Sequence, residues 1–243
     1  MQNRYVADIG DYVKLAILRR LALDRSLGVA WWLFPDEHHN ADGDHREYLE
    51  RPKSWKHFDP NLFDVLLKIE KEGKRHVHAI EKSGVLPNAI FTSDHIPCEA
   101  EPFSLRREER SIWIKGIKSK LKDCNLLFLD PDNGVASEGL RLTQRRAGKS
   151  VTIEEMEALQ GDSRAMVVYH HQTRRQGGHL NEIDSLAMRL RERGLHVSGA
   201  LRAKPWSPRV FFILNGDQEL LDRAKNIAEI WGNWISWIPL SKS

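Results

Sequence analysis

The stretch CNLLFLDPDNGV, residues 124–135, decides the fold class. Its run of four apolar residues, 126–129, predicts a strand that is buried on both faces, as in a parallel sheet covered by helices. The strand should end at Asp130-Pro131, because proline lacks the N–H that a sheet ladder needs. The Asn133-Gly134 pair that follows tolerates left-handed backbone geometry, so we expect a tight polar turn directly after the strand.

Similar apolar runs alternate with helical patterns along most of the chain, which favours a mostly parallel sheet with helices on both faces. Only a short loop with two prolines separates the last two of these runs, so an antiparallel pair is expected there. The expected strands are GVAWWLFP (28–35), RHVHAIE (75–81), NAIFTSD (88–94), NLLFLD (125–130), AMVVYHH (165–171), LHVSGALR (195–202) and RVFFILNG (209–216).

The predicted fold is an α/β, three-layer Rossmann-like sandwich with a mostly parallel seven-stranded sheet and an antiparallel final strand. A chain of 243 residues suits a single domain of this kind, 1–243, with a polar, acidic and His-rich segment at 35–57. The expected helices cover residues 11–26, 60–74, 104–123, 152–161, 179–194 and 217–234.

Polar side chains stand where these strands end. In open α/β sheets ligands bind beyond the carboxyl ends of the strands, so these positions are the candidates for a functional site. The turn after the strand at 125–130 brings carboxylate and amide groups, and a pair of imidazoles ends the strand at 165–171. The predicted catalytic residues are Asp130, Asp132, Asn133, His170 and His171.

The order of these elements resembles a Rossmann-fold methyltransferase that uses S-adenosylmethionine, and is most similar to the ribosomal RNA adenine-N6 methyltransferases. In that family an acid ends the second strand, another follows the third, and a D-P-P-Y-like turn ends the fourth. Glu81, Asp94 and Asp130-Pro131 stand at those places, and RYVADIGDYVKLAILRRL and HREYLE look like counterparts of the opening helix and of a later segment.

The resemblance implies a methyltransferase-like enzyme that acts on a base amino group of nucleic acid, with S-adenosylmethionine as cofactor. Asp130 would accept a hydrogen bond from the substrate amino group, Glu81 would hold the ribose hydroxyls and Asp94 would face the adenine. The implied cofactor-binding residues are Asp11, Lys14, Asp36, Glu81 and Asp94. The chain differs from the family in two ways: the segment LFPDEHHNADGDH has a single glycine, and Asp132-Asn133 replaces the proline and tyrosine of the turn.

A second hypothesis is a metal-dependent nuclease or phosphohydrolase. Carboxylates and imidazoles are dense between residues 36 and 45, and such groups bind Mg²⁺ or Mn²⁺ in phosphodiesterases. No spacing matches a recognised metal motif, and a solvated loop would explain the same composition. In this interpretation the metal ligands would be Asp36, Asp44, Asp130 and Asp132.

The distribution of charge favours nucleic acid as a partner. The formal net charge is only +3, but the loops RLTQRRAGK and HQTRRQGGH, which follow predicted strands, are basic. The predicted phosphate contacts are Arg141, Arg145, Arg146, Lys149, Arg174 and Arg175. A catalytically silent nucleic-acid-binding module is the third possibility. The two cysteines and the lack of a long apolar run predict a cytoplasmic protein that does not associate with membranes.

Overall fold

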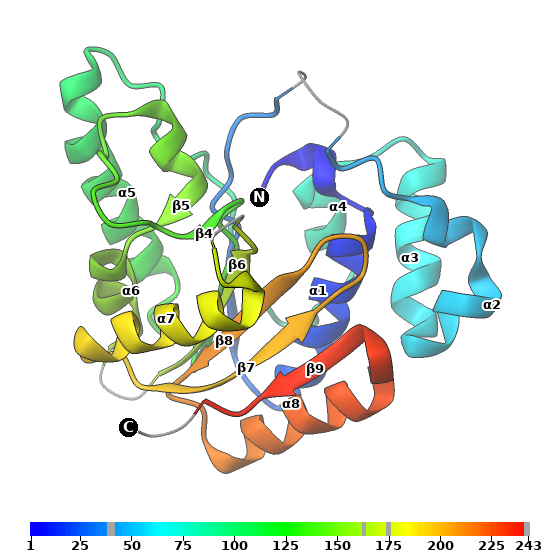
Figure 1. Ribbon diagram of the computed structural model, residues 1–243. Helices are drawn as coiled ribbons and strands as arrows, with labels where there is room; N and C mark the ends of the chain where they lie inside the picture. Colours follow the sequence, from blue (N-terminus) through cyan, green and yellow to red (C-terminus); the bar gives the residue numbers. More distant parts are fainter. Residues whose placement is uncertain (38–41, 162–163, 174–175, 241–243) are drawn as a thin grey trace.

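The computed structural model describes residues 1–37, 42–161, 164–173 and 176–240. Figure 1 shows one twisted sheet with helices on either side. The strand order in the sheet is β2-β1-β3-β6-β8-β7-β9. Its strands are β1 (Leu27–Ala30), β2 (Ile90–Thr92), β3 (Leu126–Leu129), β6 (Ala165–His171), β7 (Val197–Ala203), β8 (Arg209–Leu214) and β9 (Ile235–Ile238). A separate two-stranded ladder joins β4 (Gly134–Val135) to β5 (Ser150–Val151).

Strand directions confirm the predicted fold class. β1 pairs in parallel with β2 and β3, and β3 pairs in parallel with β6. β8 runs antiparallel to both β6 and β7, and β9 runs antiparallel to β7. Five of the seven strands therefore point the same way, and the final strand is antiparallel, as the alternation of elements predicts.

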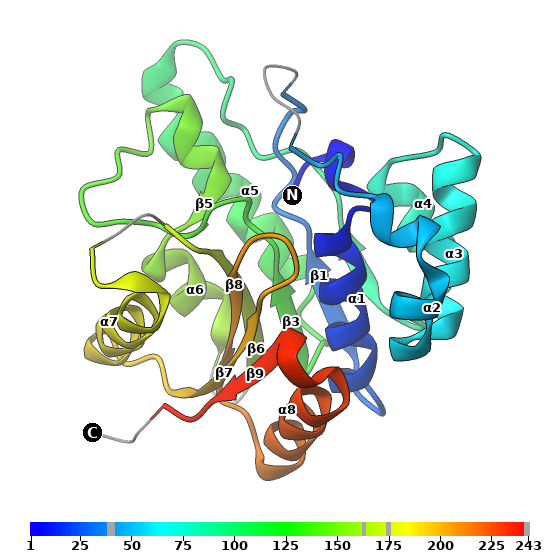
Figure 2. The same ribbon diagram turned by 45° about the vertical axis from the view of Figure 1, so that its right-hand side comes forward.

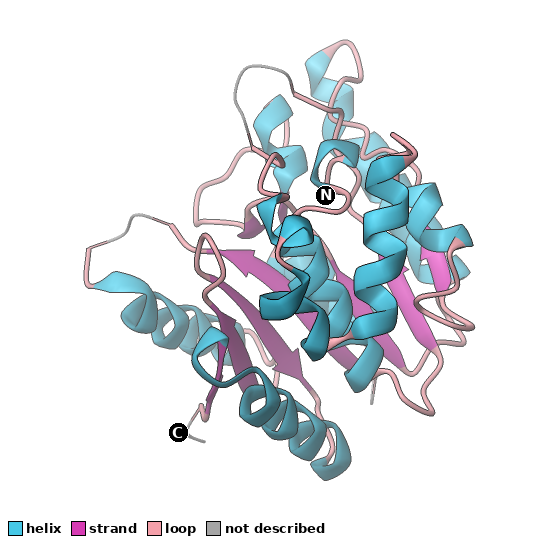
Figure 3. Ribbon diagram, turned by 90° about the vertical axis from the view of Figure 1, so that its right-hand side faces the viewer, coloured by secondary structure: helices cyan, strands magenta, loops and turns pink. Residues whose placement is uncertain are grey.

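Helices cover both faces of the sheet and make it a three-layer sandwich. On one face, seen in Figure 3, lie α1 (Ile9–Leu21), α3 (Pro60–Lys71), α4 (Val77–Lys82) and α8 (Gln218–Trp231). The opposite face is covered by α5 (Arg106–Lys120), α6 (Ile153–Gln160) and α7 (Gly178–Glu192). The short α2 (Pro52–Trp55) lies near α3. No helix in the described ranges is long and apolar enough to cross a membrane.

The apolar run of β3 shows why both faces are covered. Leu126 and Phe128 pack into the hydrophobic core on the α1 face, whereas Leu127 and Leu129 pack into the core on the α5 face. Successive strand residues point to opposite faces, so a strand that is apolar at every position needs helices on both. All four side chains are completely buried.

One expected element is wrong, and the expected last helix ends earlier than predicted. Residues 75–81, predicted as a strand, form helix α4, in which His76 caps the first turn and Val77 and Ile80, three positions apart, are both buried. The seventh strand is instead β9, which pairs with β7. The predicted last helix stops earlier because Gly232, at φ +52°, ends α8 after Trp231.

The topology places the carboxyl ends of β1 and β3 and the amino end of α1 at one edge of the sheet. From β1 the chain moves to β2 on one side and later returns to β3 on the other, so the strand order reverses between β1 and β3. At such a switch point the diverging connections leave a crevice beyond the carboxyl ends of the strands. Helix α1 leads into β1, and therefore its amino end lies at this same edge, beside the N-terminus (Figure 2).

Candidate active site

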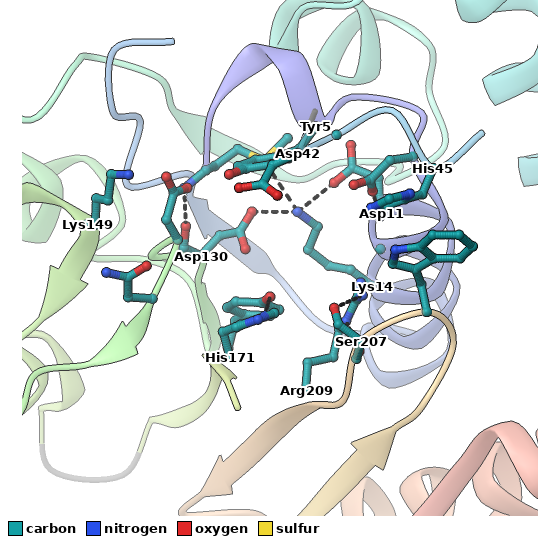
Figure 4. Close-up of a pocket in the computed structure, with 18 residues that line it drawn as sticks. Tyr5, Asp11, Lys14, Asp42, His45, Asp130, Lys149, His171, Ser207 and Arg209 are labelled. Atoms are coloured by element: carbon teal, nitrogen blue, oxygen red, sulfur yellow. Dashed lines mark hydrogen bonds and ion pairs between the residues drawn. The ribbon is translucent and has the colours of Figure 1, made fainter. Parts of the chain in front are cut away.

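A cavity of about 320 Å³ lies at this edge, which we call the strand-end cavity. Helix α1, the turn after β3, the end of β6 and the turn before β8 contribute its walls (Figure 4). The lining is strongly charged. Its acids are Asp8, Asp11, Asp42, Asp130 and Asp132, and its cations are the Met1 ammonium, Lys14, Lys149 and Arg209.

Lys14 is the centre of the cavity wall. Its Nζ lies 2.6 Å from Asp11 Oδ1, one turn earlier on α1, and 2.6 Å from Asp130 Oδ2, at the end of β3. All three side chains are almost completely buried. The structure thus brings together the two α1 residues and the strand-end acid that the family resemblance implies for one site, and Figure 4 shows the Lys14 amine between the two carboxylates.

Burial affects the protonation of Lys14 and of the acids beside it. It raises the pKa of Asp11 to about 7, although the Lys14 ammonium favours the ionised carboxylate. Asp8, the N-cap of α1, has a pKa that is also raised by burial. The pKa of Lys14 lies above its usual range because attraction to Asp11 and Asp130 outweighs the burial that would lower it. The site therefore holds a fixed cation beside a carboxyl group that can exchange a proton near neutral pH.

Asp132 ties the chain's first residues to the turn. Its Oδ1 lies 2.6 Å from the Met1 ammonium, and its Oδ2 accepts a hydrogen bond of 2.5 Å from Gln2 Nε2. The Met1 ammonium also donates to the carbonyl oxygen of Asp130 at 2.7 Å. Both Asp132 oxygens are thus engaged by the protein, whereas Lys14 contacts Asp130 through Oδ2 and no described residue is seen to bind its Oδ1.

The end of β6 separates the two predicted histidines. His171 lines the strand-end cavity, where its Nδ1 lies 3.1 Å from the hydroxyl of Tyr169. Burial, with the nearby Arg209 guanidinium, lowers the pKa of His171, so that its imidazole is neutral at pH 7. Burial also raises the pKa of Tyr169 to about 12.

His170 points to the other face and serves a different cavity, which we call the side cavity; its lining includes His170, Glu182 and Arg189. The N–H of Val135 donates to His170 Nδ1 at 3.1 Å, which leaves the proton on Nε2, 3.3 Å from Glu182 Oε1. Burial would raise the pKa of Glu182, but hydrogen bonds from His170 and Thr173 lower it to about 2. Gly134 is required here, since at φ +88° any Cβ would collide with the His170 ring. Asn133 and His171 line both cavities.

The other residues implied for S-adenosylmethionine do not join this site. Glu81 Oε1 accepts a hydrogen bond of 2.9 Å from the buried Trp31 indole, and Asp94 is exposed beyond β2. Asp36 accepts from the backbone N–H of Arg4, and none of these three acids lines the strand-end cavity. After β1, where the family has its glycine turn, residues 31–34 fill the core with large side chains. These residues do not fit the nucleoside half of the cofactor as the resemblance implies.

The alternative metal ligands are also dispersed. Asp44 pairs with Arg46 on the segment before α2, while Asp130 and Asp132 are engaged by Lys14 and the Met1 ammonium. Within the described ranges, no three His, Cys, Asp or Glu side chains form a group that could hold a metal ion. His38 and His39 lie outside the described residues.

The predicted phosphate contacts lie on the loop between β4 and β5. Arg141 and Arg146 are exposed, Arg145 pairs with Glu99 at 2.7 Å, and Lys149 reaches the strand-end cavity and pairs with Glu37. Arg174 and Arg175 lie outside the described residues.

Several residues of the strand-end cavity are not predicted from the sequence. Tyr5 and Asp8 precede α1, His45 lies before α2, and Trp206, Ser207 and Arg209 form the turn into β8. The segment KPWSPR gives one usable signal, because a bulky aromatic residue between two prolines has little room to bury itself. Comparison of the chain with protein families, with curated proteins and with solved structures found no match.

Proposed function

We propose that the chain is an enzyme that acts on a base amino group of nucleic acid, with its active site in the strand-end cavity. One observation carries this proposal: Lys14 joins Asp11 and Asp130 at the switch point of the sheet, in a cavity lined by both acids and cations. An amino group donates hydrogen bonds to a carboxylate, and a phosphate has no such donor. Asp130 therefore favours a base, and the basic loop 141–149, whose Lys149 lines the cavity, favours the backbone of a nucleic acid.

The chain's own residues provide a path for the proton that an amino group loses when it is substituted. Asp130 Oδ1 would accept the hydrogen bond from the amino group and then its proton. The carboxyl group of Asp130 would then turn to bring this proton to Lys14. Lys14 would take it while passing one of its own protons to Asp11, and so keep its positive charge. Lys14 Nζ lies 2.6 Å from Asp11 Oδ1 and 2.6 Å from the Oδ2 position of Asp130, and Asp11, with a pKa of about 7, is a suitable acceptor.

Methyl transfer is the first candidate for the reaction, because Asp130 stands where the resemblance implies the acid that holds the substrate amino group. The nucleoside of the cofactor would have to be held by residues other than Asp36, Glu81 and Asp94, which do not line the cavity. The test is incorporation of labelled methyl groups from S-adenosylmethionine into RNA and DNA. We expect Asp130→Asn, which keeps an oxygen acceptor for Lys14, to lower transfer by about 10²-fold or more. Asp36→Asn is the matched control and should retain activity, since Asp36 lies outside the cavity.

Three results would count against this reaction. Equal transfer by Asp130→Asn and the unmodified chain would remove Asp130 from the site, provided that both proteins melt at similar temperatures. Cleavage of the nucleic acid on addition of Mg²⁺ or Mn²⁺ would favour the phosphohydrolase instead. Tight binding without any turnover would favour the silent binding module.

A further inference from the structure

Trp206 is the most exposed large apolar side chain in the described part of the chain, at 66%. It lies in the turn between β7 and β8 and belongs to the lining of the strand-end cavity. Its backbone has φ +64°, a left-handed conformation that is rare for a bulky residue. An exposed indole on a strained backbone is costly, and such strain is concentrated at functional sites.

Hydrogen bonds from Arg209 and within the turn itself fix the turn that carries Trp206. The guanidinium of Arg209, which is buried, donates to the carbonyl oxygen of Pro205 at 3.2 Å and to Ser207 Oγ at 3.1 Å. The Ser207 N–H donates to the Pro205 carbonyl at 2.9 Å. With Pro205 and Pro208 on either side, the backbone of the turn is held in place before any ligand arrives, which lowers the entropic cost of binding.

His45 supports the indole from one side. The two rings are stacked with centroids 4.0 Å apart and an interplanar angle of 30°, and both residues line the cavity. His45 is itself anchored, because its carbonyl oxygen accepts a hydrogen bond of 2.9 Å from the N–H of Ile9 at the start of α1. Two segments that are far apart in the sequence thus build one aromatic surface in the lining of the strand-end cavity.

We propose that Trp206 and His45 form a stacking platform for a nucleobase, whose amino-bearing edge then faces the acids of the cavity. Every nucleobase has a flat aromatic face, so any of the bases gains stacking energy on an indole. The carboxylates favour a ring whose edge carries hydrogen-bond donors. The platform supplies the aromatic contact that the turn at 130–133 lacks. It rests on the proposed function only for the direction in which the base points.

The test measures binding of a fluorescently labelled single-stranded oligonucleotide by anisotropy, with adenosine monophosphate as competitor. We expect Trp206→Ala to weaken both affinities by about tenfold or more, and Trp206→Phe to retain most of the affinity. Phe103→Ala is the matched control, since Phe103 is 61% exposed but does not line the cavity.

Equal affinity of Trp206→Ala and the unmodified chain would overturn the platform, as would equal weakening by Phe103→Ala. Failure of the unmodified chain to bind either probe at millimolar concentration would also overturn it. The proposed reaction is tested separately. Weakened binding in Trp206→Ala without any methyl transfer would refute the reaction and retain the platform. If Trp206→Ala leaves both methyl transfer and affinity unchanged, the platform would be refuted and the reaction retained.

Discussion

Lys14 shows how one buried charge can organise a site. An ammonium group taken out of water is unfavourable unless carboxylates surround it, and each carboxylate is unfavourable without the ammonium. Asp11 and Asp130 come from different elements, so their pairing with Lys14 fixes α1 against the end of β3. The same contacts that position the proposed proton path therefore also stabilise the fold.

Replacing Lys14 by methionine should destabilise the protein by about 3–5 kcal/mol, because two buried carboxylates would lose their common partner. Urea unfolding at pH 7 measures this change. The control is Lys56→Met, whose ion pair with Asp64 is solvent-exposed and should contribute less than about 1 kcal/mol. Similar losses in the two variants would contradict the structural role of the buried group.

The raised pKa of Asp11 predicts the sign of a pH dependence. Because the pKa is about 7 in the folded protein and near 3.8 in the unfolded chain, the folded state binds more protons between these values. The stability contributed by Asp11 is fully present below about pH 4 and is lost as the pH rises through about 7.

Asp11→Asn should remove this contribution, which has a slope of up to about 1.4 kcal/mol per pH unit. Denaturation curves of both proteins between pH 4 and pH 8 provide the measurement. Asp64→Asn, at an exposed position, should keep the pH profile of the unmodified chain. A profile of Asp11→Asn that runs parallel to that of the unmodified chain would show that Asp11 ionises normally.

Among the elements, the long apolar runs could be predicted and the short ambiguous ones could not. β3 is apolar at every position and β6 is apolar over its first four residues, which leaves a buried strand as the main solution. Residues 75–81 satisfy both the strand period and the helix period, because Val77 and Ala79 alternate while Val77 and Ile80 share a helical face.

The cavity shows the same limit of prediction, since the stacking of His45 on Trp206 depends on tertiary geometry that no local pattern encodes.

β9 is the element whose packing is most easily tested. Gly199 on β7 lies directly against the ring of Trp237 on β9, and a Cβ at this position would collide with that ring. Gly199→Ala should lower the free energy of unfolding by about 1–3 kcal/mol. Gly116→Ala, inside α5 with open space around its Cβ position, should raise it by about 0.5–1 kcal/mol. Thermal melts of the two variants should therefore shift in opposite directions, and a shift in the same direction would contradict the register of β9.

Over the whole molecule, exposed basic side chains lie both near the carboxyl ends of the strands and near their amino ends. The loop with Arg141 and Arg146 connects β4 to β5. Arg146 lines the side cavity, which shares Asn133 and His171 with the strand-end cavity, whereas Arg141 lies beside α5 and α6. The last turn of α5 lies at the opposite edge, because α5 leads into the amino end of β3, and it carries Lys118. If nucleic acid binds at the strand-end cavity, only the first group of cations should contact its phosphates.

We therefore expect the affinity for single-stranded nucleic acid to fall with salt, and the slope of log K against log salt to decrease in size by about 0.7 for each phosphate contact removed. Arg141→Gln and Arg146→Gln should each produce a decrease of this kind. Each guanidinium that binds a phosphate releases counterions from the nucleic acid, and a variant that lacks the guanidinium releases fewer. Lys118→Gln should leave the slope unchanged, although it removes the same charge from the molecule. Anisotropy titrations across a salt series distinguish a local contact from an effect of net charge. Equal changes of the slope in all three variants would mean that net charge alone attracts the nucleic acid. The nucleic acid would then not bind at this edge of the sheet.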